Sequence, residues 1–311
     1  ALSAALFRPV RNTTQHLVDR YIYGLRFDLN ELQQAQRPKT VTNPGKLTGL
    51  HFGDYEILGV LGKGGMGEVY EGYGNNQRVA IKTLLPDTAT KEDSLIRFQR
   101  EAETGRKLDH PTIARVFDSG SYEGTPYIIM EYLDGQDLGD RLKQDGKLDI
   151  ETTLAIAQDV CTALLLAHEA GYVHRDLKPS NIMIRENGSA GLMDFGISKV
   201  QDDHSITGTD AIGTIHYMAP EQIIASREVD PRADIYALGV LLYEMLTGVK
   251  PFKGTPAQIL FGHLQQPAPD VRMANPEIPR HIAKAINKAM SKHPDDRFQM
   301  VGEFAEALLS P

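Results

Sequence analysis

Residues 174–181 read His-Arg-Asp-Leu-Lys-Pro-Ser-Asn, and residues 194–196 read Asp-Phe-Gly. The first run places Asp176, a carboxylate that can accept a hydroxyl proton, five residues before Asn181, an amide that can hold a metal ion. Asp194 adds a second carboxylate. Phosphoryl transfer needs such a set, because the attacking oxygen must be oriented and oxygen ligands must hold magnesium beside the phosphates.

A glycine-rich run lies upstream, at residues 61–70, and contains the pattern Gly-x-Gly-x-x-Gly-x-Val. Glycines let backbone N–H groups approach phosphate oxygens without a Cβ in the way. Alone, this pattern is as typical of a glycine-rich hairpin. Here it lies between two strand-like segments, 55–60 and 69–73, which predicts a lid over phosphates. A dinucleotide-binding turn would lead into a helix instead.

The next motif is Val79-Ala80-Ile81-Lys82, a short buried strand that ends in a lysine. Such a lysine can simply extend its ammonium to the surface, or it can bind phosphates if a carboxylate holds it in place. Residues 94–105 predict a helix with one apolar face. Glu101 borders that face and is the preferred partner, while Glu103 points further outward and is the second candidate.

Taken in order, these motifs and Ala219-Pro220-Glu221 resemble the bacterial eukaryotic-like (Hanks-type) serine/threonine protein kinases, over residues 54–311. The resemblance implies an α+β, bilobal protein-kinase fold with a helical N-terminal extension. We expect the extension and a linker at 1–53, a strand-rich N-lobe with the hinge at 54–133, and a helical C-lobe at 134–311. Helices are predicted at about 149–169, 232–246, 280–292 and 296–309, and another from Thr255.

The resemblance also implies a role for each motif residue in ATP-dependent transfer to protein Ser or Thr hydroxyls. Asp176 would orient and deprotonate the hydroxyl, Lys178 would neutralise the transferred group, and Thr214 would help to position the substrate. Lys82, held by Glu101, would bind phosphates. The expected ligands are ATP and Mg²⁺ or Mn²⁺, with the metal on Asn181 and Asp194. The implied ATP-binding residues are Leu61, Gly62, Gly64, Gly67, Val69, Ala80, Lys82, Met130, Glu131, Leu133, Asn181 and Asp194.

The segment between Asp194 and Glu221 predicts regulation by phosphorylation. Arg175 directly precedes Asp176, an arrangement that resembles kinases whose activation segment is ordered by phosphate. Thr207 and Thr209 are the candidate acceptors, because a phosphate there adds about −1.5 to −2 charge that can pair with the arginine. They can equally be solvated loop residues. Because a chain can hardly place its own loop in its own cleft, we expect self-association and phosphorylation in trans.

Two other classes of function remain open. A catalytically weak kinase-fold scaffold or ATP sensor would be expected to lack Lys82, Asp176 or Asp194, and all three are present. A small-molecule phosphotransferase of related fold would be expected to lack the segment that ends at Ala219-Pro220-Glu221, which in protein kinases docks the peptide. A protein substrate is therefore favoured.

Composition agrees with a globular enzyme: 41% of residues are hydrophobic and 24% are charged. The net charge of −8 argues against nucleic acid as a partner. The single cysteine, Cys161, lies in an apolar stretch and is expected to be a buried core thiol. No apolar run is predicted to span a membrane.

Residues 1–46 differ in charge from the rest, with seven Lys or Arg against three acidic residues, net +4. They weakly resemble segments that follow the last span of bacterial membrane sensor kinases. Docking or dimerisation through this extension is favoured over membrane contact. The expected location is the cytoplasm, with a possible tether to the inner face of the membrane through sequence before Ala1. Removing residues 1–46 is expected to leave every catalytic motif in place.

Overall fold

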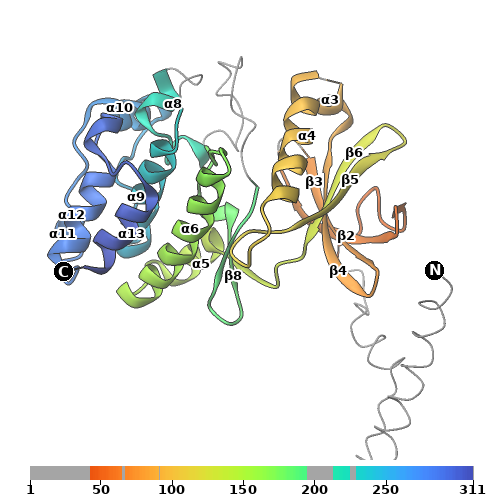
Figure 1. Ribbon diagram of the computed structural model, residues 1–311, viewed down its shortest axis with the longest axis horizontal. Coiled ribbons are helices and arrows are strands. Elements are labelled where there is room, and N and C mark those ends of the chain that lie inside the picture. Colours follow the sequence, from red (N-terminus) through yellow and green to blue (C-terminus); the bar gives the residue numbers. More distant parts are fainter. Residues whose placement is uncertain (1–42, 65–66, 91, 195–212, 225–228, 311) are drawn as a thin grey trace, which may run out of the picture.

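The computed structural model describes residues 43–64, 67–90, 92–194, 213–224 and 229–310. These residues form a strand-rich part and a mainly helical part, which lie side by side in Figure 1. Among the described residues, six strands and two helices form the first part, and most of the elements after residue 137 are helices. This is the α+β, two-part arrangement that the motif order predicts.

The strand-rich part is one antiparallel sheet in the order β1-β2-β3-β4-β6-β5. Successive side chains of a strand face opposite sides of the sheet. Val79 and Ile81 are therefore buried on one face, and Ala80 and Lys82 lie on the other. The strands are β1 His51–Phe52, β2 Tyr55–Lys63, β3 Gly67–Gly74, β4 Gln77–Leu84, β5 Val116–Tyr122 and β6 Thr125–Glu131.

The face that carries Lys82 is covered by helix α4, Glu92–Lys107, which follows the short helix α3, Pro86–Ala89. Phe98 and Ala102 of α4 are buried in the cluster that includes Ile128 and Met130 of β6. Gly105 lets the helix approach the sheet, since a Cβ there would lie 2.3 Å from Val116 Cγ2. The apolar stripe of α4 thus fixes its rotation and points Glu101 toward the sheet.

The helical part is built around α9, which is buried on almost every side. Asp149 caps α6 and Thr255 caps α10 through their side chains, as expected for these residue types. This part also contains a three-stranded sheet in the order β7-β8-β9. Its strands are β7 Gly135–Asp137, β8 Ile182–Arg185 and β9 Ala190–Leu192. The helices are α5 Leu138–Asp145, α6 Ile150–Glu169, α8 Pro220–Ile224, α9 Arg232–Thr247, α10 Pro256–Gln265, α11 Val271–Ala274, α12 Arg280–Ala289 and α13 Val301–Leu309, with 3₁₀ turns η1 Pro179–Asn181 and η4 Pro294–Asp296.

The helix predicted at 296–309 begins later in the chain than predicted. Residues 296–300 are not part of α13, because Pro294 opens the 3₁₀ turn η4 and Arg297 then takes an extended conformation. The α-helix starts only at Val301. The predicted 280–292 helix also ends early, at Ala289.

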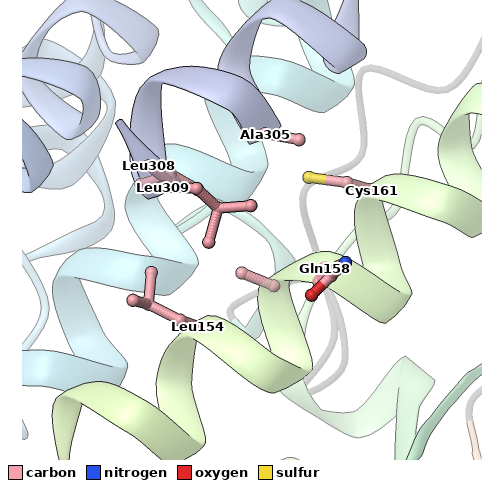
Figure 2. Close-up of a pocket in the computed structure, with 7 residues that line it drawn as sticks. Leu154, Gln158, Cys161, Ala305, Leu308 and Leu309 are labelled. Carbon is pink, nitrogen blue, oxygen red and sulfur yellow. The ribbon is translucent and has the colours of Figure 1, made fainter. Parts of the chain in front are cut away.

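Helix α6 contradicts the prediction that no apolar run is long enough to span a membrane. By length and composition alone it qualifies, with a mean hydropathy of 1.4. In the structure it is a core helix, packed against α9, α13 and β9. Figure 2 shows its residues Leu154, Gln158 and Cys161 across a cavity of about 10 Å³ from α13. Cys161 is buried, as predicted, and burial raises the pKa of its thiol to about 12.

Residues 43–53 are part of the folded sheet region, although the sequence analysis assigned them to the extension and linker. Phe52 is fully buried and stacks on Tyr122 at 4.9 Å between ring centroids. The carbonyl of Asn43 accepts a hydrogen bond from Val60 N at 2.7 Å. Gly45 lies so close that a Cβ would sit 2.5 Å from Val60 Cγ2. The pattern of residues 43–46 has no strand period, so only the tertiary contacts reveal this packing.

These contacts change the expected effect of N-terminal truncation. Removing residues 1–42 should leave the free energy of unfolding within about 0.5 kcal/mol of the full chain, the range of surface changes. Removing residues 1–54 should lower it by at least about 3–5 kcal/mol, the usual cost of truncating a buried Phe, because Phe52 is lost. Urea denaturation of the two truncated chains measures the difference. Equal stability of both would contradict the packing of residues 43–53.

Candidate active site

An ion cluster built from three elements lies between the two parts. Lys82 Nζ of β4 lies 2.6 Å from Glu101 Oε1 of α4 and 2.9 Å from Asp194 Oδ1, which follows β9. Glu101 is thus the partner found in the structure; Glu103 points outward and is exposed. One strand, one helix and one loop converge on a single ammonium group.

The charges in this cluster depend on each other. Burial alone would lower the pKa of Lys82, but the carboxylates of Asp194 and Glu101 outweigh burial and raise it. Burial raises the pKa of Glu101, and the nearby Asp194 adds to this effect. Lys82 holds the pKa of Asp194 below its usual range despite burial. Two carboxylates and one ammonium leave an excess of negative charge, which suits a site that would take a cation.

The lid is a tight β-hairpin formed by β2 and β3. Gly64 N donates to Gly67 O at 2.9 Å. Gly67 has no space for a side chain, because a Cβ would lie 1.8 Å from Thr83 O of β4. Leu61, Gly62 and Val69 belong to the same two strands. Gly67 therefore serves the close approach of β3 and β4, whereas a Cβ at Gly62 would meet nothing within 4 Å. The two strands flank the glycine run, as expected from the sequence.

The candidate adenine site lies where β6 ends. Met130 is buried and pairs with Ala80 across the sheet. Glu131 N already donates to Arg115 O at 2.8 Å, so this amide is not available to a ligand. Leu133 is buried just beyond the strand. Met130 and Leu133 therefore provide buried apolar side chains at the point where the chain leaves the sheet.

The catalytic-loop residues are joined by hydrogen bonds. Lys178 Nζ lies 2.9 Å from Asp176 Oδ2 and 3.4 Å from Thr214 Oγ1. Asn181 Nδ2 donates to the backbone carbonyl of Asp176 at 2.8 Å. His174 Nε2 contacts Met193 O at 3.0 Å, which ties this loop to the residue before Asp194. The side chains of Asp176 and Lys178 are each about one fifth exposed, 17% and 21%, so a substrate can still reach them.

The same loop is braced by Asp234 of α9. Its carboxylate accepts hydrogen bonds from the backbone N–H groups of His174 and Arg175, both at 2.8 Å, and contacts His168 Nε2 at 2.8 Å. Arg175 has φ +65°, a conformation that costs a non-glycine residue about 1–3 kcal/mol. Gln222 holds the carbonyl of Arg175. His168 and Gln222 were not predicted, because no local pattern links residues so far apart in sequence.

Residues of the site fit a magnesium ion. Asn181 uses its amide nitrogen to bind the backbone of Asp176, so its oxygen is the atom left for a ligand. Carboxylate and amide oxygens are the donors that Mg²⁺ accepts, and it usually keeps waters and phosphate oxygens as its other ligands. Within the described part of the chain, no three His, Cys, Asp or Glu side chains gather as a metal cage. Waters and phosphate oxygens would supply the ligands that Asn181 and Asp194 do not.

An ion pair anchors helix α8, which follows residues 213–219. Arg297, whose side chain is fully buried, makes two hydrogen bonds to Glu221, at 2.6 and 2.8 Å. The same guanidinium binds backbone carbonyls of Ser291, Lys292 and Arg232. Breaking a buried pair of this kind costs about 3–5 kcal/mol.

Four residues named in the sequence analysis, Phe195, Gly196, Thr207 and Thr209, lie outside the described residues.

Comparison with known proteins agrees with the fold. The family model for the protein kinase domain matches residues 55–309. A probable serine/threonine-protein kinase of Streptomyces coelicolor is 40% identical over 261 residues, which are 81% of this chain and 39% of that protein. Serine/threonine-protein kinase PknB of Mycolicibacterium smegmatis is 39% identical over 271 residues, 83% of this chain and 43% of that protein.

The solved kinase domain of Mycobacterium tuberculosis PknI superposes with a TM-score of 0.68 at 31% identity, covering 84% of this chain and 98% of that one. The glycine-rich hairpin, the Lys82–Glu101 pair and the hydrogen-bonded loop of residues 174–181 all lie within the part of the chain that the kinase family model matches. The chain belongs to the protein kinase family, and its bacterial relatives named above are serine/threonine kinases. It spans about two fifths of the length of the curated relatives it matches.

Proposed function

We propose that this chain transfers the γ-phosphoryl group of ATP to serine and threonine hydroxyls of proteins. The observation that carries the proposal is the convergence of Lys82, Glu101 and Asp194 in one ion cluster. Burying charges is costly unless they are paired, and the side chains of Lys82 and Asp194 keep 22% and 36% of their surface exposed, so a ligand can reach the cluster. Family membership supplies the reaction class.

Each residue of the site then has a task. The ammonium of Lys82 would bind α- and β-phosphate oxygens, and Glu101 would keep it in position. Asn181 and Asp194 would hold Mg²⁺ or Mn²⁺, which supplies positive charge at the phosphates. Stabilising the charge that develops on the transferred group is the main source of rate in such reactions.

The acceptor would lie against the catalytic loop. Asp176 would accept a hydrogen bond from the hydroxyl, orient its oxygen and take its proton. Lys178, already bonded to Asp176, would neutralise the transferred group. Thr214, within 3.4 Å of Lys178 Nζ, would help to position the hydroxyl. This contact supports serine and threonine as substrates, because it places Thr214 beside Lys178, one of the two groups that the short side chain must approach.

A protein substrate is supported by residues 213–224, which are held against the helical part. Glu221 is fixed by Arg297, and Tyr217 hydrogen-bonds to Glu244. A firmly anchored surface beside the catalytic loop suits a peptide better than a free metabolite.

The test of the proposed function is transfer of labelled γ-phosphate to a generic basic protein with Mg²⁺ present. Absence of transfer by a chain that binds ATP would favour the scaffold or ATP-sensor alternative.

Regulation by phosphorylation of the activation segment is a further part of the proposal. Arg175 is half-buried, and burial lowers the pKa of its guanidinium. Its Nη2 donates to Val229 O at 3.2 Å, but its buried Nε has no hydrogen-bond partner among the described residues. A phosphate on Thr207 or Thr209 would supply the missing acceptor and an opposite charge.

Replacing both Thr207 and Thr209 with alanine is expected to lower kcat about 5–30-fold, the effect of losing 1–2 kcal/mol of ordering free energy. The cause would be a segment no longer drawn to Arg175. Mass spectrometry after incubation with Mg-ATP should find phosphate on one of the two threonines. A catalytically inactive Lys82→Met chain should gain this phosphate only when wild-type chain is added. Full activity of the double variant would exclude the mechanism.

Trans phosphorylation requires that two copies meet. The net charge of +4 on residues 1–46, against −12 for the rest of the chain, supports contact between the extension of one copy and the body of another. The same charge supports a weaker proposal, contact with the inner face of a membrane. The solution mass of the chain without residues 1–42 distinguishes a dimer held by the extension from a monomer.

A further inference from the structure

A hollow of about 180 Å³ lies on the helical part between α11 and α12, on the side remote from the six-stranded sheet (Figure 1). It is separate from the catalytic cleft and shares no residue with it. Its lining is Asp270, Arg272, Arg280, Ala283, Lys284 and Asn287. One water needs about 10–15 Å³ of such space, so the hollow has room for a group the size of a phosphate.

Three of these side chains are cations that converge from two elements. Arg280, Lys284 and Asn287 are spaced by four and three residues, so they share one face of α12. Arg272 approaches from α11. No ion pair joins Arg272, Arg280 or Lys284 to any residue in the described ranges. Such a concentration of positive charge is unusual on a chain with net charge −8.

The only carboxylate of the lining offsets one of the three positive charges, which leaves an excess of two. Asp270 is the N-cap of α11, and its Oδ1 accepts from the backbone N–H of Arg272 at 2.9 Å. It is therefore oriented toward its own helix. Nε of Arg272 is shielded from solvent and lacks a hydrogen-bond partner in the described structure. The start of α12 at Arg280 has no side-chain cap, so the positive end of that helix lies at the hollow too.

We propose that this hollow binds a phosphoryl group, either inorganic phosphate or a phosphate monoester on a serine or threonine side chain. Two guanidinium groups and one ammonium match the charge and the several acceptor oxygens of a phosphate dianion. Asn287 adds an amide donor. The acidic character of the whole chain, with a net charge of −8, disfavours a long polyanion such as nucleic acid. The proposal does not depend on the phosphotransferase activity.

Titration calorimetry of the full chain with inorganic phosphate, with a phosphothreonine peptide and with the unphosphorylated peptide tests the site. The variant is Arg280→Gln/Lys284→Gln, in which both replaced side chains are exposed. The control is Lys147→Gln/Lys253→Gln, which removes the same charge at exposed positions elsewhere. We expect the site variant to weaken phosphate binding at least about tenfold and the control to change it less than about twofold. Tighter binding of the phosphopeptide than of phosphate identifies a side-chain source, and equal binding identifies the free anion.

Three outcomes would overturn the proposal. The first is binding of phosphate that Arg280→Gln/Lys284→Gln leaves unchanged, since the anion would then occupy another site such as the cleft. The second is an equal loss in the control variant, which would show a general effect of net charge. The third is binding of the unphosphorylated peptide as tightly as the phosphopeptide. Far-ultraviolet circular dichroism of both variants establishes that each is folded.

Discussion

Replacing Lys82 with methionine is expected to reduce phosphoryl transfer about 10²–10³-fold, the usual effect of removing one charge-stabilising group. The ammonium of Lys82 lies within 3 Å of two carboxylates, at 2.6 and 2.9 Å, and it would be the cation nearest the phosphates. Methionine has a similar length and no charge, so the substitution removes the interaction and little packing. Initial rates with labelled ATP and a generic basic protein measure the effect.

The fold should survive this substitution. Without the ammonium, Glu101 and Asp194 would face each other as buried like charges, and the carboxyl with the higher pKa would take up a proton. Burial already raises the pKa of Glu101, so it is the group expected to become neutral. Lys107→Met, an exposed lysine at the end of α4, is the matched control and should keep the wild-type rate. Transfer by Lys82→Met at a near wild-type rate would show that the site is assigned to the wrong residue.

The local parts of the site could be predicted from the sequence because their signals are local. The strand 79–82 and the apolar stripe of the helix around Glu101 each follow from a period of two or 3.6 residues. Once both are placed on one sheet face, Lys82 and Glu101 must meet. The caps Asp149 and Thr255 were likewise readable from residue type.

The parts that could not be predicted depend on contacts between distant segments. Phe52 looks like one aromatic residue in a glycine-rich linker, and only its stack on Tyr122 shows that residues 43–53 belong to the sheet region. The bonds of Asp234 to His168, His174 and Arg175 could not be predicted from local patterns, because they join α9 to residues about 60 positions away.

The start of α13 shows a different limit. The run from residue 296 has helical composition, but Arg297 is drawn out of helical geometry by its buried pair with Glu221. A guanidinium with several backbone and carboxylate partners outweighs the small propensity of a few residues for helix. Likewise, the cations of the α11–α12 hollow are unremarkable in sequence, and only the packing of the two helices brings Arg272 to Arg280.

Replacing Asp176 with asparagine is expected to lower kcat about 10²–10⁴-fold, the range for loss of a positioned acid–base group. Asparagine keeps the shape of the side chain but cannot accept a proton from the hydroxyl. The metal-binding residue should stay in place, because Asn181 is held by the backbone carbonyl of Asp176 and not only by its side chain. Affinity for ATP with Mg²⁺, measured by nucleotide titration, should therefore change by less than about threefold, well under 1.4 kcal/mol.

This separation of binding from turnover distinguishes the assigned role from a structural one. If Asp176 only supported the loop, its substitution would release Lys178, disturb Asn181 and weaken ATP binding together with kcat. Asp109→Asn, at an exposed position before β5, is the matched control and should change neither quantity. A kcat close to that of the wild type in Asp176→Asn would remove Asp176 as the base. ATP binding that needs no divalent metal would count against Asn181 and Asp194 as metal ligands, because these two residues have an assigned task only when a cation bridges them to the phosphates.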